Sequence, residues 1–259
     1  MQESERGRMS PRILVTGAAA GIGKASALRL ASEGASLALI DVDGYALTAV
    51  AAEARAGATE VMQLVADVAD EQAIAGATRA VQESWGGLDA AVAAAGISMS
   101  TTGDARVDQL DLAVWERLLR NNLTGTFLTC KYAVRLMLTT GSGSMVVVGS
   151  PTGLYGGAFG EHGYSASKGG CHALARAMAG ELAPLGVRVN IVIPGWINTR
   201  MNAHVVADPA LMVEAEQQIP LGRIGQPEEV AGIVAWLTSA DASYATGGYF
   251  TVDGGQTCL

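Results

Sequence analysis

A glycine-rich turn near the start of the chain constrains the fold more than any other feature of the sequence. Residues 12–16 (RILVT) are short and mostly apolar, which is typical of a buried strand. The turn at 17–23 (GAAAGIG) follows at once, and residues 24–31 are good helix formers. Strand, glycine turn and helix in this order are the context of a dinucleotide-binding motif, because the backbone can approach a pyrophosphate and the helix N-terminus offers free N–H groups. Since the spacing is GxxxGxG and not the usual GxGxxG, a plain glycine-rich turn is the alternative.

The next apolar run ends in an acidic residue. Residues 35–40 (ASLALI) lead into Asp41, which can hydrogen-bond the ribose hydroxyls of NAD and would repel the 2′-phosphate of NADP. Val42 follows, where an arginine could have received that phosphate. Asp41 could instead cap the helix that is expected to begin near Gly44, but Asp43 is better placed for that cap. The segment therefore predicts NAD as the cofactor, with NADP as the less favoured alternative.

Tyr164 and Lys168 lie four residues apart in YSASK. On a helix this spacing puts both side chains on one face, one turn apart. A positive charge beside a phenol favours its deprotonated form, so the pair is suited to take a proton from an alcohol or give one to a carbonyl. The same spacing occurs on many solvated helices, and it gains weight only beside the glycine turn.

Strand and helix patterns alternate through the rest of the chain. Hydrophobic residues make up 49% and charged residues 16%, which suffices for a large core with buried parallel strands. Strands are expected near 12–16, 35–40, 60–65, 88–93, 145–149, 187–193 and 248–252, with helical stretches between them. The pattern predicts an α/β fold: a single doubly wound Rossmann-type domain with a seven-stranded parallel sheet flanked by helices. We expect residues 1–10 to be a flexible tail and residues 11–259 to form the one domain.

Charge and hydropathy exclude several classes of function. The net charge of −8 argues against nucleic acid and anionic membrane surfaces, which attract clustered lysine and arginine. No run approaches the ~18 uninterrupted apolar residues of a membrane span, and residues 1–10 lack the apolar stretch of a secretory signal. Cys130, Cys171 and Cys258 have no metal or redox spacing, so we expect no metal site and a cytoplasmic protein with free thiols.

Together these motifs resemble those of the short-chain dehydrogenase/reductase family, from Pro11 to Gly255. Residues 16–23 (TGAAAGIG) are similar to the family's TGxxxGIG, and Tyr164 with Lys168 matches its catalytic pair. The segments GSPTG at 149–153, PGWINT at 194–199, and the closing stretch to residue 255 also follow in family order.

The resemblance implies roles for individual residues. Ser150 would bind the substrate oxygen, Tyr164 would be the general acid/base, and Lys168 would support the phenol and bind ribose hydroxyls. Asn122 would kink a helix and hold a water of the proton relay. The implied catalytic residues are therefore Asn122, Ser150, Tyr164 and Lys168. The implied cofactor-binding residues, with Asp67 and Val68 at the adenine and Thr199 at the nicotinamide carboxamide, are Gly17, Ala20, Gly21, Ile22, Gly23, Asp41, Asp67, Val68, Ala94, Ala95, Gly96, Tyr164, Lys168, Pro194, Gly195, Ile197 and Thr199.

The sequence departs from the family pattern in three places. The family's NNAG is replaced by AAAG at 93–96, so support for that loop must come from elsewhere. Ala20 stands where NADP-preferring members often carry a basic residue, although Lys24 nearby leaves some NADP binding open. The segment before Tyr164 is about one residue longer than in many relatives, and its His162 is interpreted as a surface residue.

The expected activity is hydride transfer, without a metal, between NAD and a small to medium, mostly uncharged secondary alcohol or its ketone. An NADPH-dependent 3-ketoacyl-thioester reductase would share every catalytic residue, although Asp41 speaks against its cofactor. Residues 138–144 also lack the basic side chains that an acidic acyl carrier would prefer. A non-catalytic NAD-binding sensor or scaffold is the alternative from another class, but it would need no proton relay.

The resemblance places a substrate loop at about 196–218 and an apolar pocket around it, with Arg200 as the nearby cation. Helices over 107–138 and 163–183 are expected to be apolar on more than one face, which together with the resemblance predicts a homotetramer, or failing that a homodimer. The expected pocket residues are Leu154, Tyr155, Phe159, Trp196, Met201, Val205, Val206, Leu211 and Met212.

Overall fold

The computed structural model describes residues 10–98, 103–156 and 160–258, so nearly all of the expected tail lies outside the described residues. Within these ranges one seven-stranded sheet has the order β3-β2-β1-β4-β5-β6-β7, and all neighbouring strands pair in parallel. The predicted seven-stranded parallel sheet is confirmed, with bounds that differ from the expected ones by a residue or two. The strands are β1 (Arg12–Thr16), β2 (Ser36–Asp41), β3 (Glu60–Val65), β4 (Ala90–Ala93), β5 (Gly143–Val148), β6 (Val187–Pro194) and β7 (Tyr249–Val252).

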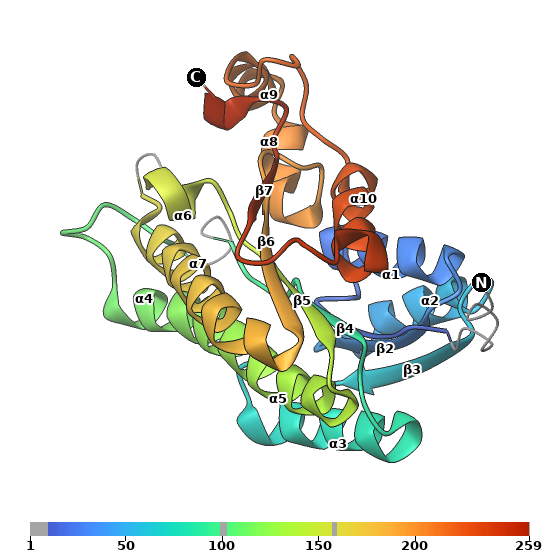
Figure 1. Cartoon of the computed structure of the whole chain (residues 1–259). Helices are drawn as coiled ribbons and strands as arrows, with labels where there is room; N and C mark the ends of the chain where they lie inside the picture. The colour runs from blue at the N-terminus through green and yellow to red at the C-terminus, as the bar shows by residue number, and fades with distance from the viewer. Residues whose placement is uncertain (1–9, 99–102, 157–159, 259) are drawn as a thin grey trace.

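Helices cover both faces of the sheet (Figure 1). On one face α3 (Glu71–Trp85), α5 (Gly125–Thr140) and α7 (His162–Leu182) share a hydrophobic core with strand residues such as Leu14 and Ile191. On the other face α1 (Gly21–Ser32), α2 (Gly44–Ala54) and α10 (Pro227–Thr238) pack on Ile13, Val15 and their neighbours. Because both faces of the inner strands are buried, these strands are mostly apolar runs, as the sequence predicts for a parallel sheet, whereas the edge strands β3 and β7 are partly exposed.

The strand order reverses at β1, which lies between β2 and β4. Ligands of open α/β sheets bind at such a switch point, outside the carboxyl ends of the strands. The glycine turn after β1 lies at this point and requires glycine: a Cβ at Gly23 would stand 2.1 Å from the Gly17 carbonyl oxygen, and one at Gly17 2.8 Å from the Ala95 Cα. Gly17 also has a positive φ of 69°.

The prediction of one helix over 107–138 is wrong at its start and in its middle. Residues 107–111 are turn and loop, and α4 (Leu112–Leu118) begins only after Asp111, whose side chain accepts from the Ala113 N–H. A π-helical turn, η2 (Leu119–Thr124), then separates α4 from α5. The turn contains Asn122, as the resemblance implied for a kink, and a π-turn inside a helix often marks a functional site.

A small lid stands above the carboxyl ends of β6 and β7 (Figure 1). It consists of α8 (Ala203–Ala207) and α9 (Pro209–Gln217), which close on a separate hydrophobic cluster around Val205, Ala215, Ile219 and Ile224. No helix among the described residues has the length and hydropathy to cross a membrane. The remaining short elements are α6 (Thr152–Tyr155), η3 (Ala183–Leu185), η4 (Arg200–Asn202), η5 (Ala240–Ala242) and η6 (Gln256–Cys258).

We expect Gly23→Ala to destabilise the protein, because the new Cβ would overlap the Gly17 carbonyl. Overpacking of this kind lowers the free energy of unfolding by about 1–3 kcal/mol. The matched control is Gly76→Ala in α3, where an added Cβ meets nothing within 4 Å. That change should raise the unfolding free energy by about 0.4–1 kcal/mol. Urea denaturation of both variants checks the pair, and equal effects would contradict the close packing of the turn.

Candidate active site

A cavity of about 670 Å³ runs along the carboxyl ends of the strands at the switch point. It is lined by the glycine turn, the ends of β2, β4, β5 and β6, the start of α7, and the segment that leads into the lid. The structure brings together here every predicted cofactor-binding residue and, of the four predicted catalytic residues, Ser150, Tyr164 and Lys168. Asn122 lies just behind the wall, where its Oδ1 would be 3.3 Å from a Cβ on Gly96.

The glycine end of the cavity fits a dinucleotide pyrophosphate. Helix α1 has no side-chain cap at Ala20 and no acidic residue in its first turn. Its first N–H groups therefore have no competing anion from the chain, and a helix N-terminus of this kind favours phosphate. Gly21 faces Thr199, and a Cβ on Gly21 would lie 3.2 Å from the Thr199 methyl carbon, so glycine keeps this part of the cradle open.

Asp41 is fixed at the end of β2, where it faces the cavity. Its Oδ2 accepts from the Ala19 N–H at 3.0 Å, and its Oδ1 accepts from the Asp43 N–H at 3.0 Å. Asp43 in turn caps α2 through the Ala46 N–H, so the predicted division between a capping and a cavity-facing aspartate is what the structure has. Each Asp41 oxygen keeps a further lone pair for a ligand hydroxyl.

The AAAG loop is supported by Asn122. The Asn122 Oδ1 accepts from the Ile97 N–H at 2.8 Å, and its Nδ2 donates to the Ile97 carbonyl at 3.0 Å and to Ser167 Oγ at 3.1 Å. One amide thus joins the π-turn to the segment after β4 and to α7. These bonds support the segment directly after the AAAG loop.

Lys168 is buried, with 5% of its surface exposed, and its Nζ donates to the Val148 carbonyl at the end of β5, 3.0 Å away. The Nζ also lies 5.9 Å from the centre of the Tyr164 ring. An ammonium has three N–H donors, so two are left for groups in the cavity. Tyr164 and Lys168 therefore lie on one face of α7, as predicted, and both line the cavity.

Ser150 is buried on the turn between β5 and α6. Its Oγ lies 3.0 Å from Thr152 Oγ1 and accepts from the Thr152 N–H at 3.3 Å. Both hydroxyl-bearing residues line the same cavity as Tyr164. The arrangement can place a hydroxyl donor and a phenol on one substrate oxygen.

The sequence reasoning missed two residues of this region. Asp104 holds the start of α7: its Oδ2 accepts from the Tyr164 N–H at 2.9 Å and its Oδ1 from the Gly163 N–H at 3.2 Å. His172 is buried behind Ser150, and its Nε2 accepts from the Ser150 N–H at 3.3 Å. Burial, and after it the nearby Lys168 ammonium, lower the pKa of His172 to about 4. The spacing of Tyr164, Lys168 and His172, four residues apart each time, is the signal that could have found it.

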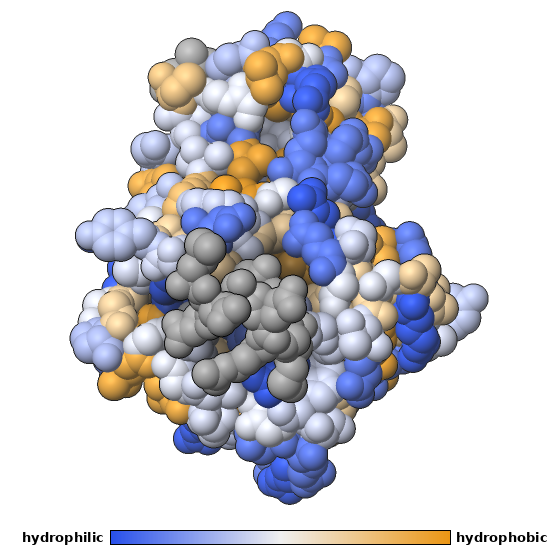
Figure 2. Space-filling model, turned by 45° about the vertical axis from the view of Figure 1, so that its right-hand side comes forward, coloured by the Kyte–Doolittle hydropathy of each residue, from blue (hydrophilic) through white to orange (hydrophobic). Residues whose placement is uncertain are grey.

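The expected apolar pocket is only partly present. Tyr155, Trp196 and Met201 line the cavity, whereas Val205 and Met212 belong to the hydrophobic cluster of the lid. Leu154, Val206 and Leu211 are exposed, and Phe159 lies outside the described residues. Figure 2 shows apolar surface in the waist between the lid lobe at the top and the body of the molecule.

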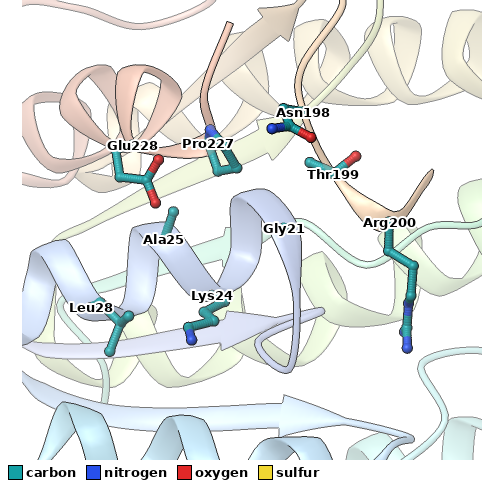
Figure 3. Close-up of a pocket in the computed structure, with 9 residues that line it drawn as sticks. All are labelled: Gly21, Lys24, Ala25, Leu28, Asn198, Thr199, Arg200, Pro227 and Glu228. Carbon is teal, nitrogen blue, oxygen red and sulfur yellow. The ribbon is translucent and has the colours of Figure 1, made fainter. Parts of the chain in front are cut away.

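Charged side chains lie at two ends of the cavity. Burial raises the pKa of Glu161, and the neighbouring Asp104 carboxylate raises it further. Arg200 lies 3.9 Å from Asp43 across the mouth and also lines a second cavity of about 350 Å³. Figure 3 shows Arg200 and Lys24 extending to the same side of that second cavity, away from Glu228. His162 is exposed, as expected.

Comparison with known proteins relates the chain to several oxidoreductases. A family model described as "Enoyl-(Acyl carrier protein) reductase" matches residues 17–257. The chain is 39% identical over 246 residues to a cis-4-hydroxycyclohexanecarboxylate dehydrogenase of Sinomonas cyclohexanicum, covering 95% of this chain and 96% of that protein. It is 39% identical over 245 residues to a 3-oxoacyl-(acyl-carrier-protein) reductase of a Synechocystis strain, covering 94% and 95%. A short-chain type dehydrogenase/reductase structure from Mycobacterium marinum matches with a TM-score of 0.89 at 36% identity, covering 96% of each chain.

We expect His172 to make the protein less stable in acid. Its folded-state pKa of about 4 lies below the ordinary value of 6.5, so between these values the unfolded chain binds a proton that the folded chain does not. The stabilisation is complete above pH 6.5 and is lost as the pH falls towards 4, by about 2–4 kcal/mol in total. The measurement is urea unfolding of the wild type and His172→Gln at several pH values.

As the pH falls, the free energy of unfolding should decrease more for the wild type than for His172→Gln. Replacing the exposed His162 by Gln is the control for the substitution itself. A wild-type-minus-variant difference that stays constant from pH 7 to pH 4 would show that His172 is not held neutral by burial.

Proposed function

Because the chain belongs to the short-chain dehydrogenase/reductase family and is an oxidoreductase of that family, we propose that it transfers hydride between NAD and a small to medium, mostly uncharged secondary alcohol or its ketone. The observation that carries the proposal is the buried Lys168 ammonium on the same helix face as Tyr164, inside the cavity that holds the glycine turn. A buried charge costs several kcal/mol unless it is hydrogen-bonded and paired, and one bond of Lys168 goes to the Val148 carbonyl. A non-catalytic sensor would not need such a charge beside a phenol.

The cavity fits a nicotinamide dinucleotide, which accepts or donates hydride when bound. The first turn of α1 would hold the pyrophosphate, Asp41 the adenosine ribose and Thr199 the nicotinamide end. NAD is favoured over NADP because a fixed carboxylate at Asp41 repels a 2′-phosphate, and Val42 offers it no partner. Lys24 pairs with Glu53 at 2.9 Å, so the nearby cation is already engaged.

The chain's own residues carry the proton. The deprotonated Tyr164 phenol takes the proton from the alcohol oxygen in oxidation, and the protonated phenol gives it to the carbonyl oxygen in reduction. Lys168 supports the charge that develops on the phenol, and the Ser150 hydroxyl donates to the reacting oxygen. Asn122 holds the π-turn against Ile97 and Ser167, and thereby the wall beside Lys168.

The charges around the cavity favour an uncharged substrate. Glu161 lines the cavity, and its carboxylate form would repel a carboxylate or phosphate of a substrate. Tyr155, Trp196 and Met201 offer apolar surface, which gains about 25 cal/mol per Å² covered. The similarity to a cis-4-hydroxycyclohexanecarboxylate dehydrogenase supports a cyclic secondary alcohol, although the compound in that name also carries a carboxylate.

A 3-oxoacyl-thioester reductase is the second candidate, because relatives of the same similarity carry that name. Asp41 argues against the NADPH that such a reductase uses, whereas equal turnover with NAD and NADP would favour this second candidate.

The expected cytoplasmic location and homotetramer stay predictions. Phe127 on α5 is 44% exposed, which supports a subunit contact on that helix, and light scattering at micromolar concentration measures the mass.

We expect Tyr164→Phe to abolish turnover while leaving the fold and NAD binding intact. The change keeps the ring and removes the proton, so the rate should fall by at least ~10²–10⁴-fold. The assay follows NADH absorbance with a panel of secondary alcohols, and NAD binding is measured by calorimetry on the same preparation. Near-normal turnover in the variant would overturn the assigned mechanism.

We expect the wild type to prefer NAD over NADP by about 30- to 1000-fold in kcat/KM, from lost hydrogen bonds and repulsion. Asp41→Asn removes the charge but keeps a side-chain oxygen at the end of β2, so the contacts with the Ala19 and Asp43 N–H groups are partly retained. The ratio of kcat/KM for NAD to kcat/KM for NADP should therefore decrease in this variant. Wild-type kcat/KM values that are equal for the two cofactors would refute the preference.

A further inference from the structure

One buried titratable group is not used by the proposed chemistry. His172 is 3% exposed and lies one helical turn beyond Lys168 on α7, so Tyr164, Lys168 and His172 form one stripe that faces the end of β5. Its Nε2 accepts from the Ser150 N–H at 3.3 Å. We propose that His172 is a positioning residue that holds the turn bearing Ser150 in place for the substrate oxygen, which rests on the proposed function.

The turn around Ser150 is shaped to receive this ring. A Cβ on Gly149 would lie 2.3 Å from the His172 Nε2, and a Cβ on Gly153 would lie 2.7 Å from its Cε1. The two glycines on either side of Ser150 therefore leave the space that the imidazole fills. On its other side the ring meets Tyr249 of β7 edge-on, with 5.4 Å between ring centroids. The ring is clamped between the β5–α6 turn and the last strand.

The ring serves as an acceptor at a cost that an apolar side chain would avoid. The Ser150 N–H already points at Nε2, so a neutral ring carries its proton on Nδ1. Nδ1 is buried without a hydrogen-bond partner among the described residues. An unpaired buried polar atom is unfavourable, and a leucine would remove that penalty but leave the Ser150 N–H unpaired. Histidine at this position therefore supplies the hydrogen-bond acceptor for the Ser150 N–H.

The surroundings keep the ring neutral and the acceptor available. Burial and the Lys168 ammonium lower the pKa of His172 to about 4, so Nε2 keeps its lone pair at neutral pH. The other cation on this side is Arg176, whose guanidinium carbon lies 6.0 Å from the centre of the Tyr249 ring, beyond that ring. The Lys168 charge opposes protonation of His172, and the Gly153 backbone has a smaller opposite effect.

The test compares His172→Leu, which removes the acceptor, with His172→Gln, which keeps a carbonyl oxygen near the place of Nε2. Leu182→Ala, on the same helix and also buried, is the control for lost packing. Kinetics are measured on the full chain with NAD and cyclohexanol or the best alcohol of a panel. We expect kcat to fall about 10- to 100-fold in His172→Leu, because small misplacements of a positioned group cost this much. The Kd for NAD should stay within about twofold, and His172→Gln should recover much of the loss.

Amide hydrogen exchange gives a readout that does not depend on turnover. We expect the Ser150 amide to exchange at least about 10-fold faster in His172→Leu, while the Gly149 amide, bonded to the Val192 carbonyl at 2.8 Å, keeps its protection. Unchanged Ser150 protection would overturn the proposal. A kcat that falls no further than in Leu182→Ala, or equal kcat losses in the Leu and Gln variants, would also overturn it.

The two proposals fail separately. If the wild type oxidises no alcohol and reduces no ketone with either cofactor, the proposed function is wrong and His172 has no reaction for which to position Ser150, so this inference is overturned with it. If the wild type is active, the variants decide on His172 alone.

Discussion

The buried ammonium of Lys168 is the interaction on which the site depends. Among the described residues it is the one buried lysine or arginine, and its bond to the Val148 carbonyl fixes it at the carboxyl end of β5. An unpaired ammonium in this position would cost several kcal/mol, so the surrounding structure has to supply oxygen atoms and a route to polar space. The cavity at the strand switch point provides that space, and the helix that carries the ammonium also carries Tyr164.

The parts around this charge are tied together by single side chains. Asn122 joins the π-turn to Ile97 and to Ser167, so the segment after β4 and α7 share one amide. Asp104 caps α7 at Tyr164 itself, and His172 accepts from Ser150 at the other end of the same stripe. The glycine turn completes the cavity from the opposite side, and Gly17 and Gly23 are packed too closely there to carry a side chain. The geometry thus comes from contacts between distant segments on a rigid sheet.

The sequence predicted what depends on local pattern. The apolar runs and the alternation with helices gave all seven strands, and the capping role of Asp43 followed from its place before α2. The separated motifs identified the residues that the structure brings to one cavity, although their roles stay predictions. What failed was non-local. The helix expected over 107–138 begins only at Leu112. The contacts of Asp104 with the start of α7, and of His172 with Ser150, join segments 22 or more residues apart in the sequence.

The most direct test of the central claim follows a hydrogen label. The wild-type enzyme would be given NAD and a secondary alcohol deuterated at its carbinol carbon, and the cofactor would be recovered and examined by NMR. A Tyr164–Lys168 site that moves only the hydroxyl proton predicts that the deuterium passes to C4 of the nicotinamide and that none enters the solvent. Turnover in which the label exchanges with water would contradict the account, because the carbinol hydrogen would then have left as a proton.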